Sequence, residues 1–255
     1  MGINIDQCVN EILDVGHCIL RHHFPQAELK QCNEAFLPLL DDIARRIPEG
    51  NRGPKRWANG LPFAPPFYHS EFFNDDTVNE IVGRIFGQDM HISYFGLDTP
   101  TKDTGYQGIH RDVGPLFPEV SERRNPPVLL SLRFPFVDMT LDNGPFEVAD
   151  GTQHLPVQEA IAKAESGELP LKPLLLKLGD VIISDPRAVH RGTPNLTEEP
   201  RPFAGIVYNR PWYSVESHTA PLLAIEDTTK LSETFYHSLS AREQHLLRRV
   251  PRTPG

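Results

Sequence analysis

The sequence predicts a mainly β protein with flanking helices, whose strands form a jelly roll. Short runs of β-type residues recur between about positions 91 and 210, and turn signals such as Asp142-Asn143-Gly144 separate them. Regularly spaced short strands are typical of sandwiches and jelly rolls rather than of parallel sheets. Apolar residues make up 39% of the 255 residues, which is enough for a substantial core.

The first third of the chain is predicted to be mainly helical. A short helix is expected over about 6–14 and a strand over 17–24. Pro25 then begins a long helix, at the position that proline tolerates best. Residues 48–70 are dense in proline, glycine and aromatic side chains, so we expect a long, stiff loop there. Another helix begins near Asp75, Asp76 and Thr77, any of which can cap its first turn.

The remaining two thirds are predicted to carry the strands. Seven segments have β-type composition: 91–97, 108–113, 128–139, 144–149, 173–178, 180–185 and 201–210. One helix, at about 157–165, interrupts them. The chain closes with a helix in which Ser240 and Glu243 make a capping box.

These elements predict a single domain over residues 1–255, because no linker separates them. It comprises a helical N-terminal part at about 1–87, a jelly-roll core at about 88–213 and a helical tail at 214–255. The closing helix can pack on its own barrel or on that of a second copy, so a homodimer is compatible with the sequence.

Composition excludes several classes of partner. The formal net charge of -9 repels phosphate backbones, so we expect no nucleic-acid partner. No apolar run is long enough for a membrane helix, and the N-terminus lacks the basic start of a secretory signal. The three cysteines do not form a disulfide framework, and we interpret them as reduced core thiols of a cytoplasmic protein.

The first candidate metal ligands are His110 and Asp112, which are separated by one residue. In a strand, alternate side chains share a face, so both can approach one ion. Taken alone the pattern is weak, because about 0.7 chance matches are expected in a chain with this many histidines and aspartates. On the triplet alone, a structural hydrogen bond at a strand end is the favoured interpretation.

A third candidate ligand, His190, follows the apolar segment 180–185. Two histidines and one carboxylate would occupy one side of a metal and leave the other side open. That arrangement suits iron(II), which must also bind a co-substrate and oxygen. Structural zinc sites favour four protein ligands that include thiolates, which this set lacks.

Arg201 lies eleven positions after His190, at the start of the last predicted strand. If the two segments pair as a hairpin, Arg201 returns toward the same cavity, where a guanidinium can bind a carboxylate through two parallel hydrogen bonds. The alternative is a surface charge beside Glu198 and Glu199.

Four segments together resemble the phytanoyl-CoA dioxygenase family of iron(II)- and 2-oxoglutarate-dependent oxygenases. They are 108–112 with the His-x-Asp triplet, 142–154 with the turn Asn-Gly-Pro, 179–195 with the distal histidine, and 201–213 with the arginine at the family's spacing. The resemblance covers nearly the whole chain and implies a double-stranded β-helix, or cupin-like, core.

The resemblance also implies roles for individual residues. It makes His110, Asp112 and His190 the Fe²⁺ ligands and Arg201 the partner of the distal carboxylate of 2-oxoglutarate. Family members tend to place a hydroxyl two residues after the distal histidine. That position is Gly192 here, so the contact is absent or is taken over by Thr193.

The implied activity is that of a dioxygenase, an oxidoreductase that consumes O₂ and 2-oxoglutarate and releases succinate and CO₂. Hydroxylation of a C–H bond is the default, and desaturation, ring formation or epoxidation would use the same ligands. Asp112 is retained, which disfavours halogenation, because related halogenases have a small residue there. No basic cluster for a coenzyme A phosphate is evident, which favours a small specialised metabolite as substrate.

Substrate contacts are predicted less directly. The loop at 48–70 has the aromatics of a lid, including Trp57 and Phe67. Arg133 lies on one face of the strand 128–139 and contacts an anionic substrate or co-substrate if that face lines the barrel, or solvent if it does not. Tyr94 and Gln107 are close to the metal ligands in sequence and either line the cavity or pack beside it.

Two other classes of protein remain open. One is a barrel that binds a metal or ligand without catalysis, although an intact set of ligands together with Arg201 argues against it. The other is a cupin-like metal-dependent isomerase or hydrolase, which does not need Arg201 at this spacing.

Overall fold

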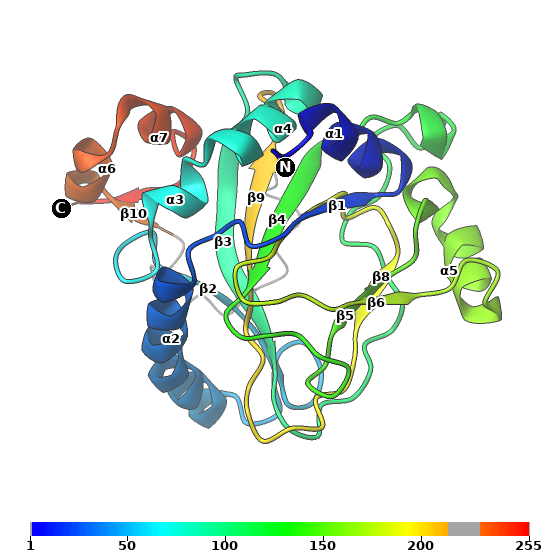
Figure 1. Ribbon diagram of the computed structural model, residues 1–255, viewed down its shortest axis with the longest axis horizontal. Helices are drawn as coiled ribbons and strands as arrows, with labels where there is room; N and C mark the ends of the chain where they lie inside the picture. Colours follow the sequence, from blue (N-terminus) through cyan, green and yellow to red (C-terminus); the bar gives the residue numbers. More distant parts are fainter. Residues whose placement is uncertain (1, 214–229, 255) are drawn as a thin grey trace.

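The computed structural model describes residues 2–213 and 230–254, and two antiparallel sheets form its centre (Figure 1). The larger sheet has the strand order β1-β7-β4-β9-β3-β2 and the smaller sheet the order β6-β5-β8. Their strands are β1 His17–Leu20, β2 Arg56–Gly60, β3 His91–Pro100, β4 Leu129–Pro135, β5 Phe146–Val148, β6 Lys172–Leu174, β7 Val181–Ser184, β8 His190–Gly192 and β9 Phe203–Asn209. The predicted fold class, mainly β with a jelly-roll core and flanking helices, is confirmed.

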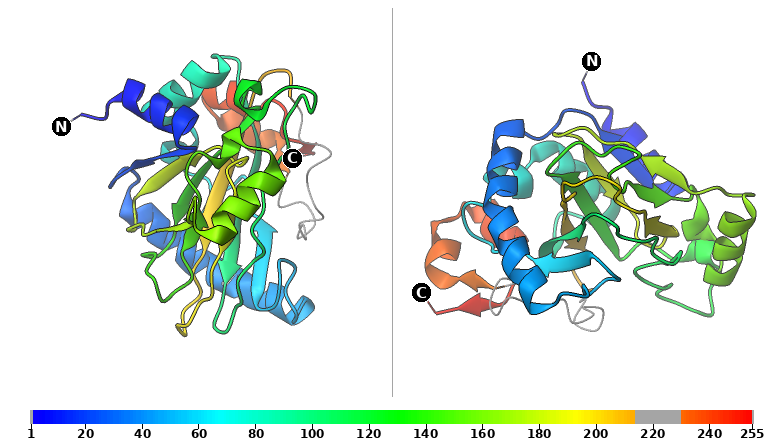
Figure 2. Two further views of the ribbon diagram at one scale, coloured as in Figure 1. Left: turned by 90° about the vertical axis from the view of Figure 1, so that its right-hand side faces the viewer. Right: turned by 90° about the horizontal axis from the view of Figure 1, so that it is seen from below.

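Most helices lie on one side of the larger sheet, and the smaller sheet lies on its other side with α5 beside it (Figures 1 and 2). The helices are α1 Ile5–Asp14, α2 Gln26–Arg46, α3 Ser70–Phe73, α4 Asp76–Phe86, α5 Val157–Ser166, α6 Glu233–Ser238 and α7 Ala241–Leu246, with 3-10 turns at Glu122–Arg124 and Thr152–His154. A short parallel pair is formed by β10 Leu231–Ser232, which precedes α6, and β11 Arg252–Thr253, which follows α7. The first part of the predicted tail, 214–229, lies outside the described residues.

Three apolar clusters fill the described part of the molecule, and the smallest includes Ala160 and Ala164 of α5. The largest one packs the other helices against the outer face of the six-stranded sheet and contains all three cysteines, which are buried and form no disulfide, as predicted. The second cluster lies between the two sheets and includes Phe146 from β5, Ile182 from β7 and Phe203 from β9. The interior between the sheets is therefore apolar on one side of the candidate site. Among the described residues, no helix has the length and apolar character needed to cross a bilayer.

The predicted helix starts agree with the observed caps. Asp75 accepts a hydrogen bond from the backbone N–H of Val78 at the start of α4. Ser240 and Glu243 form the predicted capping box at the start of α7. Pro25 is the residue that caps α2 rather than its first helical residue.

Four predicted elements differ in the structure. Residues 48–70 contain β2, because their backbone pairs with β3 despite the loop-like composition. The strand predicted at 17–24 ends at Leu20, because the next residues turn toward the loop before β7. The strand at 173–178 reduces to Lys172–Leu174. Residues 108–113 form only an isolated bridge, between His110 and His190.

The predicted hairpin between the segments of His190 and Arg201 is wrong. β8 pairs with β5 in the smaller sheet, whereas β9 pairs with β3 and β4 in the larger one. The loop between them crosses from one sheet to the other. Arg201 therefore reaches the interior from the opposite sheet, not from a strand that neighbours His190.

Asp180 joins the connection after β1 to the turn before β7. Its fully buried carboxylate accepts hydrogen bonds from the backbone N–H groups of His22 and Lys177, at 2.9 Å each, and from Arg21 at 2.6 Å. Burial alone raises the pKa of Asp180, but these three donors outweigh burial and hold the pKa below its ordinary value. A lowered pKa means that the carboxylate stabilises the fold above its unfolded pKa, and that this contribution is lost as the pH falls through the folded pKa.

We therefore expect Asp180→Asn to lower the free energy of unfolding by about 2 kcal/mol at neutral pH, because buried donors lose a charged acceptor. The difference from the wild type should be complete above about pH 4 and shrink below it. Urea unfolding at several pH values measures this, with exposed Asp142→Asn as the matched control. Equal stability of the Asp180 variant and the wild type at pH 7 would contradict the assignment.

Candidate metal and co-substrate site

The two candidate histidines lie side by side because their backbones pair. His110 N donates to His190 O at 3.0 Å, and His190 N donates to His110 O at 2.9 Å. The ring centroids are 4.5 Å apart. Asp112 follows in the same loop, where its N–H donates to the carbonyl of Pro186. Segments about 80 residues apart in sequence thus place three metal-ligating side chains together.

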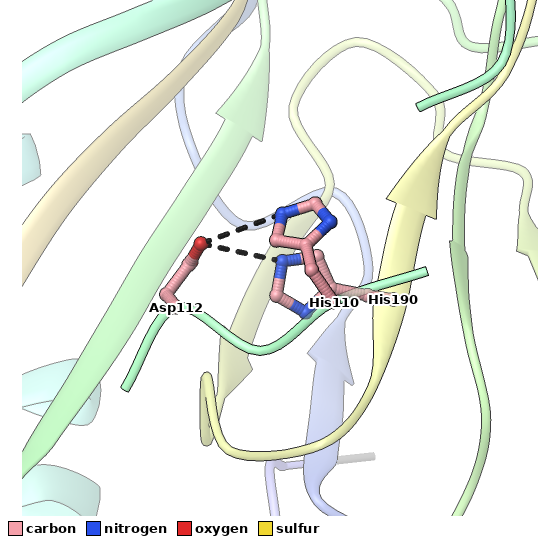
Figure 3. A group of neighbouring side chains, drawn as sticks. All are labelled: His110, Asp112 and His190. Carbon is pink, nitrogen blue, oxygen red and sulfur yellow. Dashed lines mark ion pairs between the residues drawn. The ribbon is translucent and has the colours of Figure 1, made fainter. Parts of the chain in front are cut away.

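The three side chains point toward one another, and Figure 3 shows Asp112 facing both imidazoles. Asp112 Oδ1 is 3.6 Å from His110 Nε2 and 3.6 Å from His190 Nε2. One ligand atom from each residue lies within 4.8 Å of the other two. Such a cluster can hold one metal ion, as the sequence predicts.

The protonation of both rings favours metal binding. Nδ1 of His110 lies 2.8 Å from the carbonyl of Gly108, and Nδ1 of His190 lies 2.9 Å from that of Ala188. A carbonyl can only accept, so each Nδ1 carries the proton and each Nε2 presents its lone pair. Burial and the neighbouring His190 lower the pKa of His110, which keeps its ring neutral.

The carboxylate of Asp112 is ionised. Partial burial by itself raises its pKa, but His190, Arg133 and His110 act in the opposite direction and hold the pKa well below its ordinary value. The cluster therefore offers two imidazole nitrogens and one anionic oxygen. The side chains of His110 and Asp112 are 33% and 28% exposed, so one side of the cluster is open to solvent. This donor set fits iron(II) with free positions for further ligands.

Arg201 lies in the interior with most of its donors free. It is 1% exposed, and Nη2 donates to the carbonyl of Gly144 at 2.5 Å. Within the described residues, Nε and Nη1 have no hydrogen-bond partner. Burial, with Arg56 and Arg133 nearby, lowers the pKa of Arg201 to about 9 against an opposing effect of Asp98. Buried N–H groups of a cation without an acceptor are costly, and an anionic ligand would satisfy them.

Arg56 is a second buried guanidinium that the sequence analysis missed. It is 1% exposed and donates to Asp98 Oδ2 at 2.6 Å and to the carbonyl of Thr193 at 2.9 Å. Its Nε has no partner in the described part of the chain. Alternation of side chains along residues 56–60 could have indicated that Arg56 faces the interior, but only if the segment had been recognised as a strand.

The two arginines share one face of the larger sheet. Arg56 lies opposite Pro100 of β3, and Arg201 N donates to the carbonyl of Pro100 from the other side. Residues in one cross-strand row point to the same face, and Asp98, two residues along β3, points there as well. One carboxylate, which is paired with Arg56, thus stands near two guanidiniums, and the net positive charge that remains matches one further carboxylate.

Aromatic rings lie between the two buried arginines and the metal-binding cluster of His110, Asp112 and His190, called the metal cluster below. The ring of Phe146 is 5.0 Å from that of His190 and 5.9 Å from that of Phe203. The guanidinium of Arg201 in turn lies 5.5 Å from the ring of Phe203. The metal cluster and the arginines are therefore two ends of one interior space between the sheets.

Thr193 and Gly192 explain how Arg56 fits. The hydroxyl of Thr193 donates to the carbonyl of Pro145 at 2.8 Å, so it does not take over the position left open by Gly192. A Cβ atom at Gly192 would stand 2.5 Å from Arg56 Nη1 and 2.7 Å from Gln107 Oε1. The space where the family resemblance implies a hydroxyl is occupied by the arginine.

Three predicted substrate residues lie around this interior. Arg133 Nη2 donates to Asp112 Oδ2 at 3.0 Å, so Arg133 faces the barrel rather than solvent. Tyr94 extends over Gly96, and its hydroxyl donates to the carbonyl of Asn59 at 3.3 Å. Gln107 Oε1 accepts from the backbone N–H of Gly192 at 2.9 Å, beside Arg56.

The two predicted lid aromatics belong instead to the hydrophobic core. Trp57 alternates with Arg56 along β2, so it faces away from the interior, and its indole N–H donates to the carbonyl of Ile47 at 2.8 Å. Phe67 is 3% exposed and packs in the same core. We correct both assignments, since neither side chain reaches the space between the sheets.

A separate pocket of about 510 Å³ opens beside α5 and is lined by Gln107, Glu165, Leu171 and Arg191, among others. Arg191 alternates with His190 along β8 and so faces the opposite side of the smaller sheet. The pocket therefore lies behind the metal cluster, not over it.

A jelly-roll core with two histidines and one aspartate that can hold a metal is the arrangement found in non-heme, iron(II)-dependent oxygenases. A family model described as phytanoyl-CoA dioxygenase (PhyH) matches residues 13–203, and the chain belongs to this family. The resemblance inferred from the sequence is confirmed.

Solved structures show the same fold at low sequence identity. AviO1 from Streptomyces viridochromogenes Tue57 is 17% identical with a TM-score of 0.61, and the match covers 84% of this chain and 98% of AviO1. HygX from Streptomyces hygroscopicus, with nickel, 2-oxoglutarate and hygromycin B bound, is 17% identical with a TM-score of 0.59 over 82% and 88% of the two chains. SnoN, a non-heme α-ketoglutarate-dependent epimerase from nogalamycin biosynthesis, is 14% identical with a TM-score of 0.55 over 81% and 80%.

Proposed function

We propose that this chain is an Fe(II)- and 2-oxoglutarate-dependent dioxygenase that oxidises a C–H bond of a small organic molecule, by hydroxylation in the simplest case, and releases succinate and CO₂. His110, Asp112 and His190 hold the iron, and Arg201 together with Arg56 binds the distal carboxylate of 2-oxoglutarate. The observation that carries the proposal is that a metal-binding cluster and a buried, unsatisfied guanidinium face one interior space.

The residues of the chain have separate tasks in this proposal. Bound iron supplies the activation of dioxygen. The carbonyls of Gly108 and Ala188 keep both imidazoles in the tautomer that presents Nε2. The arginines orient the co-substrate by two-point contact with its far end, so that its keto acid is directed at the open side of the cluster. Phe146 and Phe203 keep water out of the space between, which strengthens these charge interactions.

We propose a specialised metabolite as the substrate and a single domain as the catalytic unit. HygX binds hygromycin B and SnoN acts in nogalamycin biosynthesis, and both share this fold. Tyr94 and Gln107 are the polar groups that we assign to substrate contact, because both border the interior. SnoN is an epimerase, which supports treating hydroxylation as one of several outcomes available to such a site.

Anaerobic visible spectroscopy tests this function. The metal-free protein is titrated with iron(II) and then with 2-oxoglutarate. We expect a weak charge-transfer band that needs both additions, followed by succinate formation once oxygen is admitted. Succinate does not require the true substrate, because uncoupled turnover also consumes 2-oxoglutarate. Iron binding without any band or succinate would reject the proposal in favour of a non-catalytic barrel or an isomerase.

The contact between Arg56 and Gly192 makes a further prediction about the co-substrate. Arg56→Ala removes charged hydrogen bonds to 2-oxoglutarate worth about 1.5–3 kcal/mol, so we expect its Kd to rise roughly 10- to 100-fold. Gly192→Ser alone should also weaken binding, because its Cβ collides with Arg56. The double variant should bind more tightly than Arg56→Ala, since the serine hydroxyl then occupies the vacated space. A double variant whose loss of affinity equals the sum of the two single losses would contradict this arrangement.

A further inference from the structure

Asp112 is the one residue of the metal cluster whose side chain is not held by its own segment. Each imidazole is fixed by an Nδ1–carbonyl bond two residues away and by the paired backbones of His110 and His190. Asp112 lies in a loop without regular secondary structure, where its backbone N–H donates to the carbonyl of Pro186. Among the described residues, Arg133 is the single donor to its carboxylate at hydrogen-bond distance, at 3.0 Å.

Arg133 is itself held by both sheets. It projects from β4, in the row that places Gly205 of β9 beside it. Its guanidinium lies 5.1 Å from the ring of Phe146 on β5, and this ring also packs against His190. The side chain is 20% exposed, so its position is restrained by packing as well as by charge. Arg133 is therefore held in place by both sheets, and its hydrogen bond restrains the side chain of Asp112 in the loop.

The pairing uses only one of the two carboxylate oxygens. Arg133 binds Oδ2, whereas Oδ1 is the oxygen that faces both Nε2 atoms. A carboxylate with one oxygen engaged by a guanidinium presents the other oxygen alone, in a fixed direction. Hydrogen-bonded partners of metal ligands commonly determine ligand orientation in this way.

We infer that Arg133 is a positioning residue, which fixes Asp112 as a one-oxygen ligand and thereby keeps the remaining positions of the metal free for the co-substrate and oxygen. This role rests on the proposed function, and it replaces the direct substrate contact that the sequence predicted for Arg133. Arg133 is bonded to Asp112, whereas Arg56, paired with Asp98, and Arg201 are the residues that we assign to the far carboxylate of the co-substrate.

The direction of the change in metal affinity distinguishes a positioning role of Arg133 from a purely electrostatic one. Removing a positive charge near a cation site, taken alone, strengthens binding of a divalent metal. Losing the one hydrogen-bond donor to the Asp112 carboxylate among the described residues weakens binding, and outer partners of metal ligands are typically worth 10- to 100-fold in affinity. The two explanations therefore predict changes in opposite directions.

The test measures Co(II) affinity by calorimetry and the visible Co(II) spectrum, which reports the arrangement of ligands independently of activity. Arg133→Met removes the charge and the donors at similar length, Arg133→Gln keeps an uncharged donor, and Arg133→Lys keeps a charged one. Arg191→Met is the matched control, because Arg191 is also half-buried and pairs with Glu147 at 2.7 Å on the outer face of β8. Thermal unfolding of the metal-free proteins verifies that each variant folds.

We expect Arg133→Met to bind Co(II) about tenfold or more weakly, with a changed spectrum, and Arg133→Lys to recover most of the affinity. Arg191→Met should resemble the wild type. Unchanged or tighter binding by Arg133→Met and Arg133→Gln, with the wild-type spectrum, overturns the positioning role but leaves the proposed function standing. Failure of the wild type itself to bind Co(II) or iron(II) overturns both.

Discussion

Replacing Asp112 by alanine should abolish turnover, because the metal cluster then keeps two neutral imidazoles and no anionic ligand. Loss of an outer-shell partner already costs up to about 100-fold in metal affinity, so loss of the ligand itself should exceed that. Arg133 would then face the cluster without its carboxylate partner, and its positive charge would repel a divalent ion further. Metal titration and succinate formation measure the two effects.

Glu147→Gln is a suitable control for Asp112→Ala. Glu147 pairs with Arg191 on the outward side of β5 and β8. Its carboxylate is therefore close to the segment of His190 but does not face the site. We expect this variant to keep the wild-type metal affinity. If Asp112→Ala bound iron(II) as tightly as the wild type and still formed succinate, Asp112 would not be a ligand.

Arg201→Ala should cost the largest share of 2-oxoglutarate affinity while leaving metal affinity in place. Breaking a buried charge pair by removing one partner typically costs about 3–5 kcal/mol, which corresponds to roughly 10²- to 10⁴-fold in Kd. The effect should exceed that of Arg56→Ala, because Arg56 is already paired with Asp98 and Arg201 has no acidic partner among the described residues. The charge-transfer band, titrated against 2-oxoglutarate, gives the Kd.

Arg201→Lys provides the comparison for Arg201→Ala. A lysine keeps the charge but cannot reproduce the two-point geometry of a guanidinium, so we expect an intermediate Kd. Co-substrate selectivity is a second measure: the wild type should strongly prefer 2-oxoglutarate to a 2-oxo acid without a distal carboxylate, and Arg201→Ala should lose most of this preference. Full affinity and full selectivity in Arg201→Ala would instead support the isomerase or hydrolase alternative.

Arginine at position 56 makes the proposed co-substrate site differ from the pattern implied by the family resemblance. A hydroxyl is expected two residues after the distal histidine, and Gly192 cannot supply one. The missing side chain leaves room for a guanidinium that enters from β2, with Asp98 to compensate its charge. The missing hydroxyl at position 192 and the buried guanidinium of Arg56 are therefore linked, because the space left by the first is filled by the second.

Local patterns in the sequence were sufficient for the fold class and for the identities of the clustered residues. Helix starts depend on capping side chains within three residues, so the sequence predicted the box of Ser240 and Glu243 and placed Asp75 among three candidate caps. The His-x-Asp triplet and the distal histidine were readable because their order and chemistry are specific, and the resemblance to the family followed from four such segments in order.

Strand pairing and side-chain direction were decided only by the tertiary structure. β2 exists because residues 56–60 pair with β3, which their loop-like composition does not reveal. Alternation along that strand then places Arg56 in the interior and Trp57 in the outer core, and a shift of one residue would exchange them. No local pattern fixes that register.

The same reason explains the remaining differences. Whether Thr193 or Arg56 stands beside Gly192, and whether Arg133 meets Asp112 or solvent, depends on contacts between segments that are 20 to 140 residues apart. Such contacts form only when both sheets are in place. The sequence by itself thus determined which chemical groups this protein can use, whereas the packing of one sheet on the other decided which of them face the metal cluster and which hold its ligands in position.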